Sequence, residues 1–442
     1  MSGSGDAAPP PHVVEDFFGV IQLLSDGSVV RADDAALLAM PMPELQDVPG
    51  VQWKDAVYDA THGLRVRVFK PAAAAAGDDG GKLPVLVYFH GGGYCIGALD
   101  QSPFHTFCLR AADELPAVVL SVQYRLAPEH RLPTAIDDGA AFFSWLRGAG
   151  SADPWLAESA ELARTFISGV SAGANLAHHV AVRVASGRQP VVDDVDPVVR
   201  VAGYVLLDAF FGGVERTAAE ANPPADVSLL TVEMADQFWR LALPAGATRD
   251  HPVANPFGPE SPSLEAVALP PALVVASGGD VLYDRVVGYA ARLKEMGKAV
   301  ELVEFEGAQH GFSVIQPWSP ETSEVIQVLK RFVHRRYAQL RVEKDKAKLS
   351  GIISTLVYFQ FQHLCFVWVI KVFVKYPLSK NKKYKSVCLR LRCARLPCSL
   401  LQVIFLFEWG WFEHFIQFPF YGAYIAGWTS YPGILFPAES SH

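Results

Sequence analysis

The sequence predicts an α/β protein with a mostly parallel central sheet flanked by helices. Short, continuous apolar runs alternate with helix-like stretches, as expected when strands are buried on both faces by crossover helices. The chain has 442 residues and is 50% hydrophobic, so it can bury a large core. The predicted strands of this sheet are residues 85–89, 117–122, 165–168, 204–207, 272–276 and 300–305.

The N-terminal part precedes this alternation. Residues 1–11 are small, acidic and proline-rich, and we interpret them as a disordered N-terminus rather than a secretory signal. Residues 12–50 form an apolar lead-in, in which Asp26-Gly27 predicts a hairpin turn. Residues 51–58 and 64–69 alternate between apolar and polar side chains, which predicts an antiparallel edge of the sheet.

Residues 212–262 interrupt the alternation. They are rich in proline, predict one helix at residues 232–241 and carry no predicted strand, so we interpret them as an insertion that covers one end of the sheet. The last helix of the main domain is expected at residues 320–340. The main domain should therefore extend from residue 12 to about residue 340.

The tail at residues 341–442 has a different composition. After residue 350 it holds nine Lys and Arg against three Glu, in a chain whose net charge is −8. Residues 351–370 contain no Lys, Arg, Asp or Glu and could span a bilayer, although Gln360 and His363 interrupt them. Two interpretations remain open, a membrane anchor and an extension without function.

Charge and cysteine usage indicate the class of the main domain. Because the tail is basic, the rest of the chain is acidic, which gives no reason to expect nucleic-acid binding. Of six cysteines only Cys95 and Cys108 lie in the first 350 residues, so no disulfide framework is expected. These features predict a reducing compartment, the cytoplasm or also the nucleus, and no metal or cofactor is expected.

A serine between two glycines is the first candidate catalytic residue. Ser171 lies in Gly169-Val170-Ser171-Ala172-Gly173, between a predicted strand and the Ala-rich, proline-free residues 172–186. A serine in this strand-turn-helix context is typical of a nucleophile elbow, in which the hydroxyl is exposed on a strained turn. The alternative is an ordinary turn, since serines between glycines also occur there.

A serine nucleophile needs a base, and the base needs a carboxylate to hold its tautomer. His310 lies between the last predicted strand and the last helix, where a loop could bring it to Ser171. Asp280 follows the strand at 272–276, at an end where catalytic groups collect. Asp284 is the competing acid, but it should lie inside the next helix, where an aspartate is often only a cap.

Three glycines in His90-Gly91-Gly92-Gly93-Tyr94 directly follow the strand at 85–89. Successive glycines let backbone N–H groups converge on one point, as a developing oxyanion requires, and the N–H of Ala172 can join them. The alternatives are a glycine hinge and a phosphate-binding loop. The phosphate-loop pattern, in which lysine follows the last glycine, is absent here.

Together these motifs resemble those of the plant carboxylesterases in the hormone-sensitive-lipase-like group of α/β hydrolases. The resemblance covers residues 12–340 and is carried by HGGGY at 90–94, YRLAPEHRLPTAIDD at 124–138, GVSAGAN at 169–175, HPVANPFGP at 251–259, GGDVLYD at 278–284 and QHGF at 309–312. It implies an α/β-hydrolase fold, a small-molecule ester as substrate, and a cap built from residues 12–50 and 212–262. The site residues it implies are the triad Ser171, Asp280 and His310 and an oxyanion hole of Gly92, Gly93 and Ala172.

Two positions depart from the family pattern. The family usually has aspartate at the position of Val170, and a residue followed by proline at the position of Asp208-Ala209. The first departure affects the positioning of the elbow, and the second affects the shape of the acyl pocket. For that pocket the aromatic side chains of Tyr94, Phe210 and Phe211 are the predicted lining.

A binding protein is the alternative to an enzyme. The gibberellin receptor of plants is similar to these esterases but has lost the catalytic histidine, and it binds a hormone instead. His310 is present in this chain, which favours hydrolysis. The sequence does not predict the oligomeric state.

Overall fold

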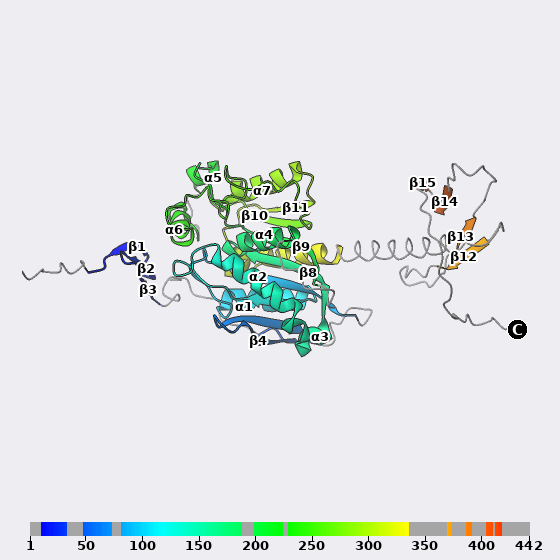
Figure 1. Ribbon diagram of the computed structural model, residues 1–442, viewed down its shortest axis with the longest axis horizontal. Helices are drawn as coiled ribbons and strands as arrows, with labels where there is room; N and C mark the ends of the chain where they lie inside the picture. Colours follow the sequence, from blue (N-terminus) through cyan, green and yellow to red (C-terminus); the bar gives the residue numbers. More distant parts are fainter. Residues whose placement is uncertain are drawn as a thin grey trace, which may run out of the picture. The chain divides into compact units, whose positions relative to one another are not determined.

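An eight-stranded sheet forms the centre of the main domain (Figure 1). From edge to edge its strands are β11 (Val300–Phe305), β10 (Ala272–Ser277), β9 (Val201–Leu207), β8 (Ala160–Val170), β6 (Leu83–Phe89), β7 (Val118–Val122), β5 (Leu64–Pro71) and β4 (Val51–Asp59). Neighbours from β11 to β7 are parallel, whereas β5 is antiparallel to both β7 and β4. The predicted parallel sheet and its antiparallel edge are confirmed.

The computed structural model describes residues 10–32, 47–72, 81–187, 199–223 and 229–335, together with four strands in the tail. The chain divides into two units, Met1–Lys344 and Asp345–His442. In the second unit β12 (Val369–Phe373) pairs antiparallel with β13 (Ser386–Arg390), and β14 (Ile404–Trp409) pairs antiparallel with β15 (Phe412–Gln417).

The segment that is long enough to span a membrane, residues 351–370, lies outside the described residues except for its last two, which belong to β12. Among the helices that the structure describes, none has the length and apolar character needed to cross a bilayer. The two interpretations of the tail therefore stay predictions, as does the disorder predicted for residues 1–11, of which only the last two are described.

Helices cover both faces of the sheet because its side chains alternate between two cores. Val85 and Val87 of β6 belong to the core that packs on α2, α4 and α7. Leu86 and Tyr88 belong to the other core, which packs on α1 and on the helix described at residues 320–335. The helices of the sheet layers are α1 (Ser102–Glu114), α2 (Thr134–Arg147), the 3₁₀ helix η3 (Ala149–Ala152), α3 (Pro154–Ser159), α4 (Ala172–Ala185), α7 (Tyr283–Glu295) and α8 (Phe312–Ile315).

Strand β8 begins five residues earlier than the predicted start at Thr165. Residues 160–164 are Ala-Glu-Leu-Ala-Arg, a composition that favours a helix. Ala160 nevertheless pairs with Leu83 of β6, and an irregularity in register separates that pair from Thr165 and Val85. Pairing with a neighbouring strand therefore overrides the local preference of this segment.

The strand order reverses next to β6. The chain passes from β6 to β7 on one side and then returns past β6 to β8 on the other side. In open α/β sheets, ligand sites lie outside the carboxyl ends of the strands at such a reversal. The glycine loop follows β6 and Ser171 follows β8, and a Cβ built on Gly91 would lie only 3.2 Å from the Cβ of Ser171.

A three-stranded antiparallel sheet of β1 (Val13–Phe17), β2 (Ile21–Leu24) and β3 (Val29–Arg31) forms the N-terminal part. The predicted hairpin is confirmed, since the N–H of Ser28 donates to Asp26 Oδ1 at 3.0 Å in the turn between β2 and β3. The insertion contributes α5 (Ala218–Ala221) and α6 (Val232–Ala242), and its described residues contain no strand.

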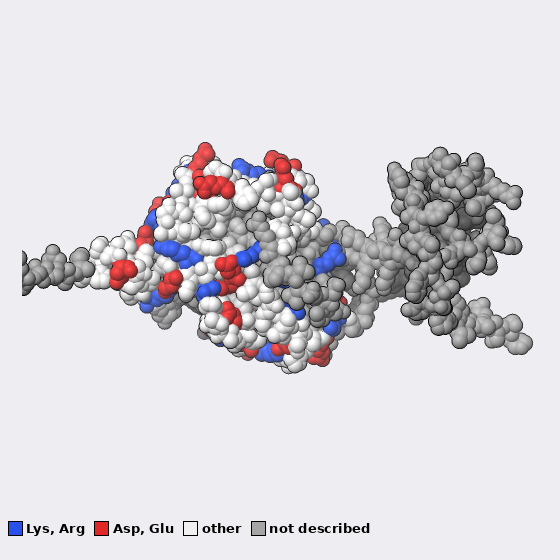
Figure 2. Space-filling model, viewed as in Figure 1, with Lys and Arg blue, Asp and Glu red and all other residues white. Residues whose placement is uncertain are grey.

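The N-terminal sheet and α6 pack against each other, and we call these two segments the cap. The rings of Phe17 and Phe238 lie 4.4 Å apart between centroids, and Glu15 and Arg240 form an ion pair of 2.9 Å. On the described surface in Figure 2, positive and negative side chains are mixed, and ion pairs such as this one join separate elements. The cap therefore depends on contacts between residues more than 200 positions apart.

We expect the main domain to fold without the tail. Every strand of the central sheet and both cores lie before residue 336, so a chain ending at residue 345 should keep the melting temperature of the main domain. Circular dichroism of both chains during heating measures this. Loss of the cooperative transition in the shortened chain, with recovery in the full chain, would contradict the expectation.

Candidate active site

Ser171 lies at the turn between β8 and α4, and its backbone is strained. Its φ of 55° is unusual for a residue that carries a Cβ. A Cβ on Gly169 would lie 2.2 Å from the carbonyl oxygen of Gly173, and one on Gly173 would lie 2.1 Å from that of Phe89. The backbone therefore approaches so closely that only glycine fits on either side of this turn.

The structure brings Ser171, His310 and Asp280 together in one hydrogen-bonded chain. His310 Nε2 lies 2.8 Å from Ser171 Oγ, and His310 Nδ1 lies 2.6 Å from Asp280 Oδ2. All three side chains are buried. The second carboxylate oxygen of Asp280 accepts the N–H of Leu282 at 3.0 Å, which fixes the acid just before α7. This geometry lets the ring take the serine proton while Asp280 holds the opposite nitrogen as a donor.

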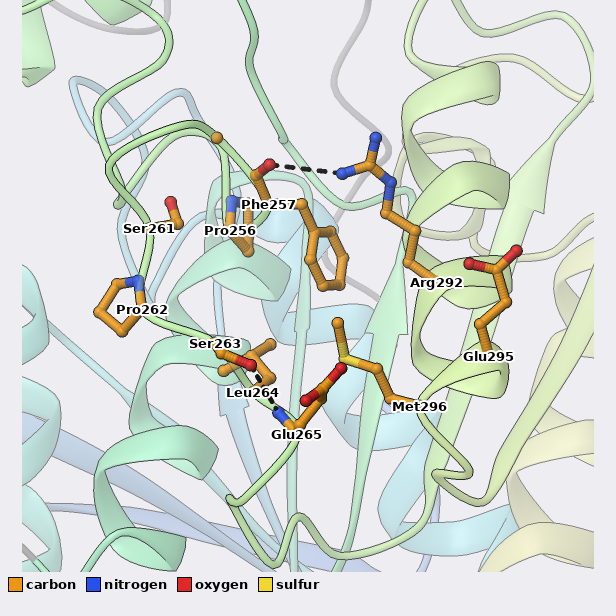
Figure 3. A pocket seen from close by; sticks show the side chains of 11 residues that line it. Pro256, Phe257, Ser261, Pro262, Ser263, Leu264, Glu265, Arg292, Glu295 and Met296 are labelled. Atoms are coloured by element: carbon orange, nitrogen blue, oxygen red, sulfur yellow. Dashed lines mark hydrogen bonds between the residues drawn. The ribbon is translucent and has the colours of Figure 1, made fainter.

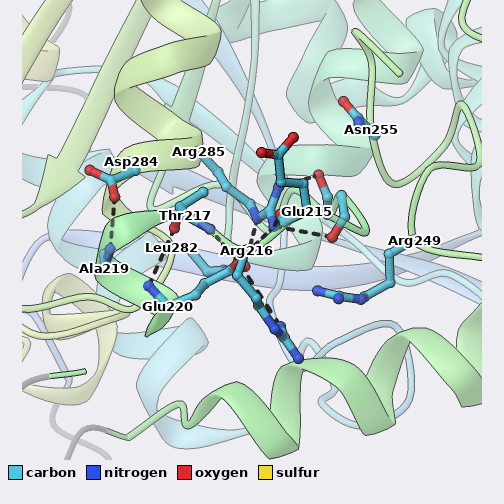
Figure 4. Close-up of polar contacts among 12 residues, drawn as sticks. Glu215, Arg216, Thr217, Ala219, Glu220, Arg249, Asn255, Leu282, Asp284 and Arg285 are labelled. Carbon is cyan, nitrogen blue, oxygen red and sulfur yellow. Dashed lines mark hydrogen bonds and ion pairs between the residues drawn. The ribbon is translucent and has the colours of Figure 1, made fainter. Parts of the chain in front are cut away.

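The competing acid has a different contact. Asp284 Oδ2 accepts the backbone N–H of Ala219 at 2.8 Å, so it ties the first turn of α5 to α7 (Figure 4). Its neighbour Arg285 strengthens the same junction, because its guanidinium binds Glu220 at 2.6 Å and the carbonyl of Gly212 at 2.9 Å. The structure thus brings Asp280, and not Asp284, to His310.

The charge around His310 determines when its ring is neutral. Burial by itself lowers the pKa of His310, but the charge of Asp280, the hydrogen bond to it and the charge of Asp208 outweigh burial and raise that pKa above its ordinary value. A base works only when it is unprotonated. A reaction that uses this ring should therefore slow as the pH falls through the raised pKa.

The glycine loop adopts a conformation that other residues avoid. Gly92 and Gly93 have φ values of +111° and +58°. A Cβ on Gly92 would lie 2.2 Å from the carbonyl oxygen of Ile96, and one on Gly93 would lie 2.2 Å from the ring of Phe238. Both glycines line the cavity that also contains Ser171. Ala172 is the first residue of α4, where backbone N–H groups lack intrahelical acceptors.

Ser171 and His310 line a cavity of about 210 Å³. Its wall is mostly apolar, and both the insertion and the rest of the main domain contribute. From the insertion come Leu229, Leu230, Met234 and Phe238, and from the main domain come Ile96, Phe104, Val170, Phe210, Val314 and Ile315, among others. The cavity can therefore hold a small apolar group next to the serine hydroxyl.

Only one of the three aromatic residues predicted for the pocket lines it. Phe210 lies in the wall, stacked on Trp239 at 4.3 Å between centroids. The Tyr94 hydroxyl instead donates to Asn175 Oδ1 at 2.6 Å within the core, and Phe211 stacks on Tyr289 at 4.6 Å. Neither Tyr94 nor Phe211 is among the residues that line this cavity, because the orientation of a loop side chain depends on neighbours that are distant in sequence.

A larger hollow of about 600 Å³ lies elsewhere, between residues 256–265 and α7 (Figure 3). Arg292 extends over it and donates to the carbonyl of Phe257 at 3.3 Å. Its lining contains serines but no histidine that could serve them as a base. We therefore assign the candidate active site to the smaller cavity. Within the described ranges, no group of three or more His, Cys, Asp or Glu could hold a metal ion.

Sequence reasoning gave no site role to two residues next to the site, one of which, Asp208, it noted only as part of a departure from the family pattern. Asp208 follows β9 and contacts the residue after His310, since its Oδ2 accepts the N–H of Gly311 at 3.1 Å. The signal for it was available, because Asp208 follows a predicted buried strand just as Asp280 does. Phe238, which covers Gly93, had no signal beyond its place in a predicted helix.

Comparison with known proteins gives the family. Residues 86–314 match the family described as alpha/beta hydrolase fold. The chain belongs to this family. The resemblance found in the sequence is thereby confirmed, and so is the predicted α/β-hydrolase fold with its mostly parallel sheet.

Named relatives include esterases and receptors. The chain is 37% identical over 303 residues to probable carboxylesterase 8 of Arabidopsis thaliana, which covers 66% of this chain and 86% of that protein. It is 34% identical to a gibberellin receptor of Oryza sativa subsp. japonica, over 64% of this chain and 81% of the receptor. The esterase and the receptor therefore both match this chain over most of its main domain.

A solved structure with the same fold is a thermostable carboxylesterase from a metagenomic library. It is 28% identical, covers 67% of this chain and 92% of its own, and has a TM-score of 0.55. The chain is therefore a carboxylesterase-type α/β hydrolase, in a set of relatives that also contains hormone receptors.

The two acids can be separated by matched amide substitutions. Asp280→Asn should lower the kcat of ester hydrolysis by about 10⁴-fold, because an amide does not hold the required tautomer of His310. Asp284→Asn should leave kcat within about threefold, since its amide oxygen can still accept the N–H of Ala219. A larger loss in Asp284→Asn than in Asp280→Asn would reverse the assignment.

The contact between the cap and the glycine loop can be tested with two substitutions. Gly93→Ala places a methyl group in the ring of Phe238, so kcat should fall at least about tenfold. Adding Phe238→Ala removes the ring and should restore part of this loss, although about 1 kcal/mol of backbone strain remains. Measuring kcat for both single variants and the double variant tests this, and an undiminished loss in the double variant would exclude the clash as the cause.

Proposed function

We propose that the protein is a serine carboxylesterase that hydrolyses small apolar carboxylic esters through an acyl-enzyme. One observation carries this proposal: the chain of hydrogen bonds from Asp280 through His310 to Ser171, which opens into an apolar cavity. A nucleophile, a base and an orienting acid in this order are the components that covalent acyl transfer requires.

In the first half of the reaction Ser171 forms the acyl-enzyme. Its Oγ attacks the ester carbonyl carbon while its proton moves to His310 Nε2. The carbonyl oxygen becomes an oxyanion that the N–H groups of the glycine loop and Ala172 stabilise. The bond to the alcohol oxygen then breaks, and His310 returns the proton to the departing alcohol.

The second half repeats these steps with water. His310 removes a proton from water while the water oxygen attacks the acyl carbon. The bond between the acyl carbon and Ser171 Oγ then breaks, and His310 returns the proton to Ser171 Oγ. The acid product leaves, and Ser171 and the neutral imidazole are restored. No cofactor or metal is needed for this balance of bonds and protons.

The size and lining of the cavity support a small, apolar ester as the substrate. Its volume of about 210 Å³ is below that of typical drug-sized sites, and aliphatic and aromatic side chains form most of its wall. An acyl chain of a few carbons would replace water against Phe210, Met234 and Phe238.

Hormone binding without hydrolysis is the alternative that the receptor relatives raise. A receptor needs no general base. In this chain His310 is present and lies within hydrogen-bond distance of Ser171, which supports hydrolysis.

Single substitutions of the nucleophile and the base test the proposal. Ser171→Ala and His310→Ala should each lower kcat by about 10⁶-fold, because the triad acts as a unit and only the oxyanion hole and binding remain. Hydrolysis of p-nitrophenyl acetate, butyrate and decanoate by the purified full chain measures this, with acetate and butyrate expected to react fastest.

The same preparations separate the two functions. Saturable gibberellin binding without ester turnover in the wild type would favour the receptor. Equal turnover in the wild type and in Ser171→Ala would exclude Ser171 as the nucleophile.

A further inference from the structure

A second buried carboxylate lies beside the triad. Asp208 directly follows β9 and is 1% exposed. Its Oδ1 accepts the hydroxyl of Ser277 at 2.7 Å, and its Oδ2 accepts the N–H of Gly311 at 3.1 Å. The proposed mechanism gives Asp208 no task, although a buried charge is costly unless its partners compensate for it.

These two contacts join the segments that carry the acid and the base. Ser277 is the last residue of β10, three positions before Asp280. Gly311 follows His310, has a φ of +69° and is the N-cap residue of the short helix α8. The carboxylate of Asp208, which follows β9, therefore connects the end of β10 with the loop after β11. It holds the backbone next to His310.

The backbone of Asp208 is adapted to this position. Its φ is +47°, in the left-handed region that Asp and Asn tolerate better than most residues. An aspartate can therefore supply both the conformation and the two acceptor oxygens. Asparagine is the closest replacement, because its amide oxygen can accept the N–H of Gly311 and its amide nitrogen can donate to Ser277.

Asp208 also contributes charge at the site. Burial and the charge of Asp280 raise the pKa of Asp208 well above the usual range of an aspartate, while His310, Ser277 and Gly311 oppose that rise. The charged groups that act on the His310 ring are Asp280 and Asp208, and each favours the protonated ring.

We propose that Asp208 is a positioning residue for the hydrolysis proposed above: its hydrogen bonds to Ser277 and Gly311 hold the His310–Gly311 turn in place. When Asp208 is ionised, its charge also favours the protonated ring of His310. The inference rests on the proposed function for its kinetic readouts. Its effect on His310 can also be measured without catalysis.

Two variants of Asp208 separate charge from hydrogen bonding. Asp208→Asn removes the charge and keeps both contacts, so the acid limb of the pH profile of kcat/KM should move to lower pH while the melting temperature stays close to that of the wild type. Asp208→Ala removes both acceptors and should lower kcat by roughly 10- to 100-fold with little change in KM.

The matched control removes a carboxylate charge far from the site. Asp137 is exposed on α2 and pairs with Arg183 at 2.6 Å, so Asp137→Asn should leave the acid limb in place. Profiles are measured on the full chain with p-nitrophenyl acetate. The titration of the His310 ring is followed by ¹⁵N NMR of histidine-labelled protein, with His310→Ala used to assign its signal.

The outcomes are distinct. Lower pKa values of His310 in Asp208→Asn than in the wild type and in Asp137→Asn, together with a loss of kcat in Asp208→Ala, support the proposal. Superimposable titrations of the wild type and Asp208→Asn, or an unchanged kcat in Asp208→Ala, overturn it. If the wild type has no esterase activity, the proposed function fails, and the NMR titration alone decides whether Asp208 acts on His310.

Discussion

The site depends on one close backbone contact, between the first turn of α4 and the end of β6. A hydrogen atom fits at Gly173, whereas a Cβ would lie 2.1 Å from the carbonyl oxygen of Phe89. This approach brings Ser171 next to the glycine loop, so close backbone packing places the candidate nucleophile beside the predicted oxyanion donors. The acid and the base then come from β10 and β11 on the other side of β8.

Helix α6 of the cap forms part of the cavity wall next to this contact. Phe238 of α6 lies against Gly93 and lines the cavity, and its own ring is supported by Phe17 of the N-terminal sheet. A change of side chain at either phenylalanine would therefore alter both the cavity and the support of the glycine loop. A single aromatic ring therefore lines the cavity and lies against the glycine loop.

Much of this arrangement could be predicted because a parallel sheet leaves a strong pattern. Runs such as residues 272–276 are apolar throughout, and Asp280 and His310 follow strands whose ends share one edge. The start of β8 could not be predicted, since residues 160–164 favour a helix, whereas in the structure Ala160 pairs with Leu83 of β6 and the carbonyl of Leu162 accepts the N–H of Arg200. The orientation of Tyr94 likewise depends on Asn175, which is 81 positions away.

Asp208 shows how a departure from a family pattern can be compatible with the same chemistry. Two buried carboxylates repel each other, and this repulsion is relieved when the imidazole between them and Ser171 becomes charged. In the proposed mechanism that charge develops only as the serine proton is transferred, so the second carboxylate would stabilise the transition state more than the resting enzyme. The consequence is a narrower working range, because the stronger base is also protonated at a higher pH. An enzyme with this arrangement therefore gains proton affinity at its base and loses activity earlier on acidification than it would with Asp280 alone.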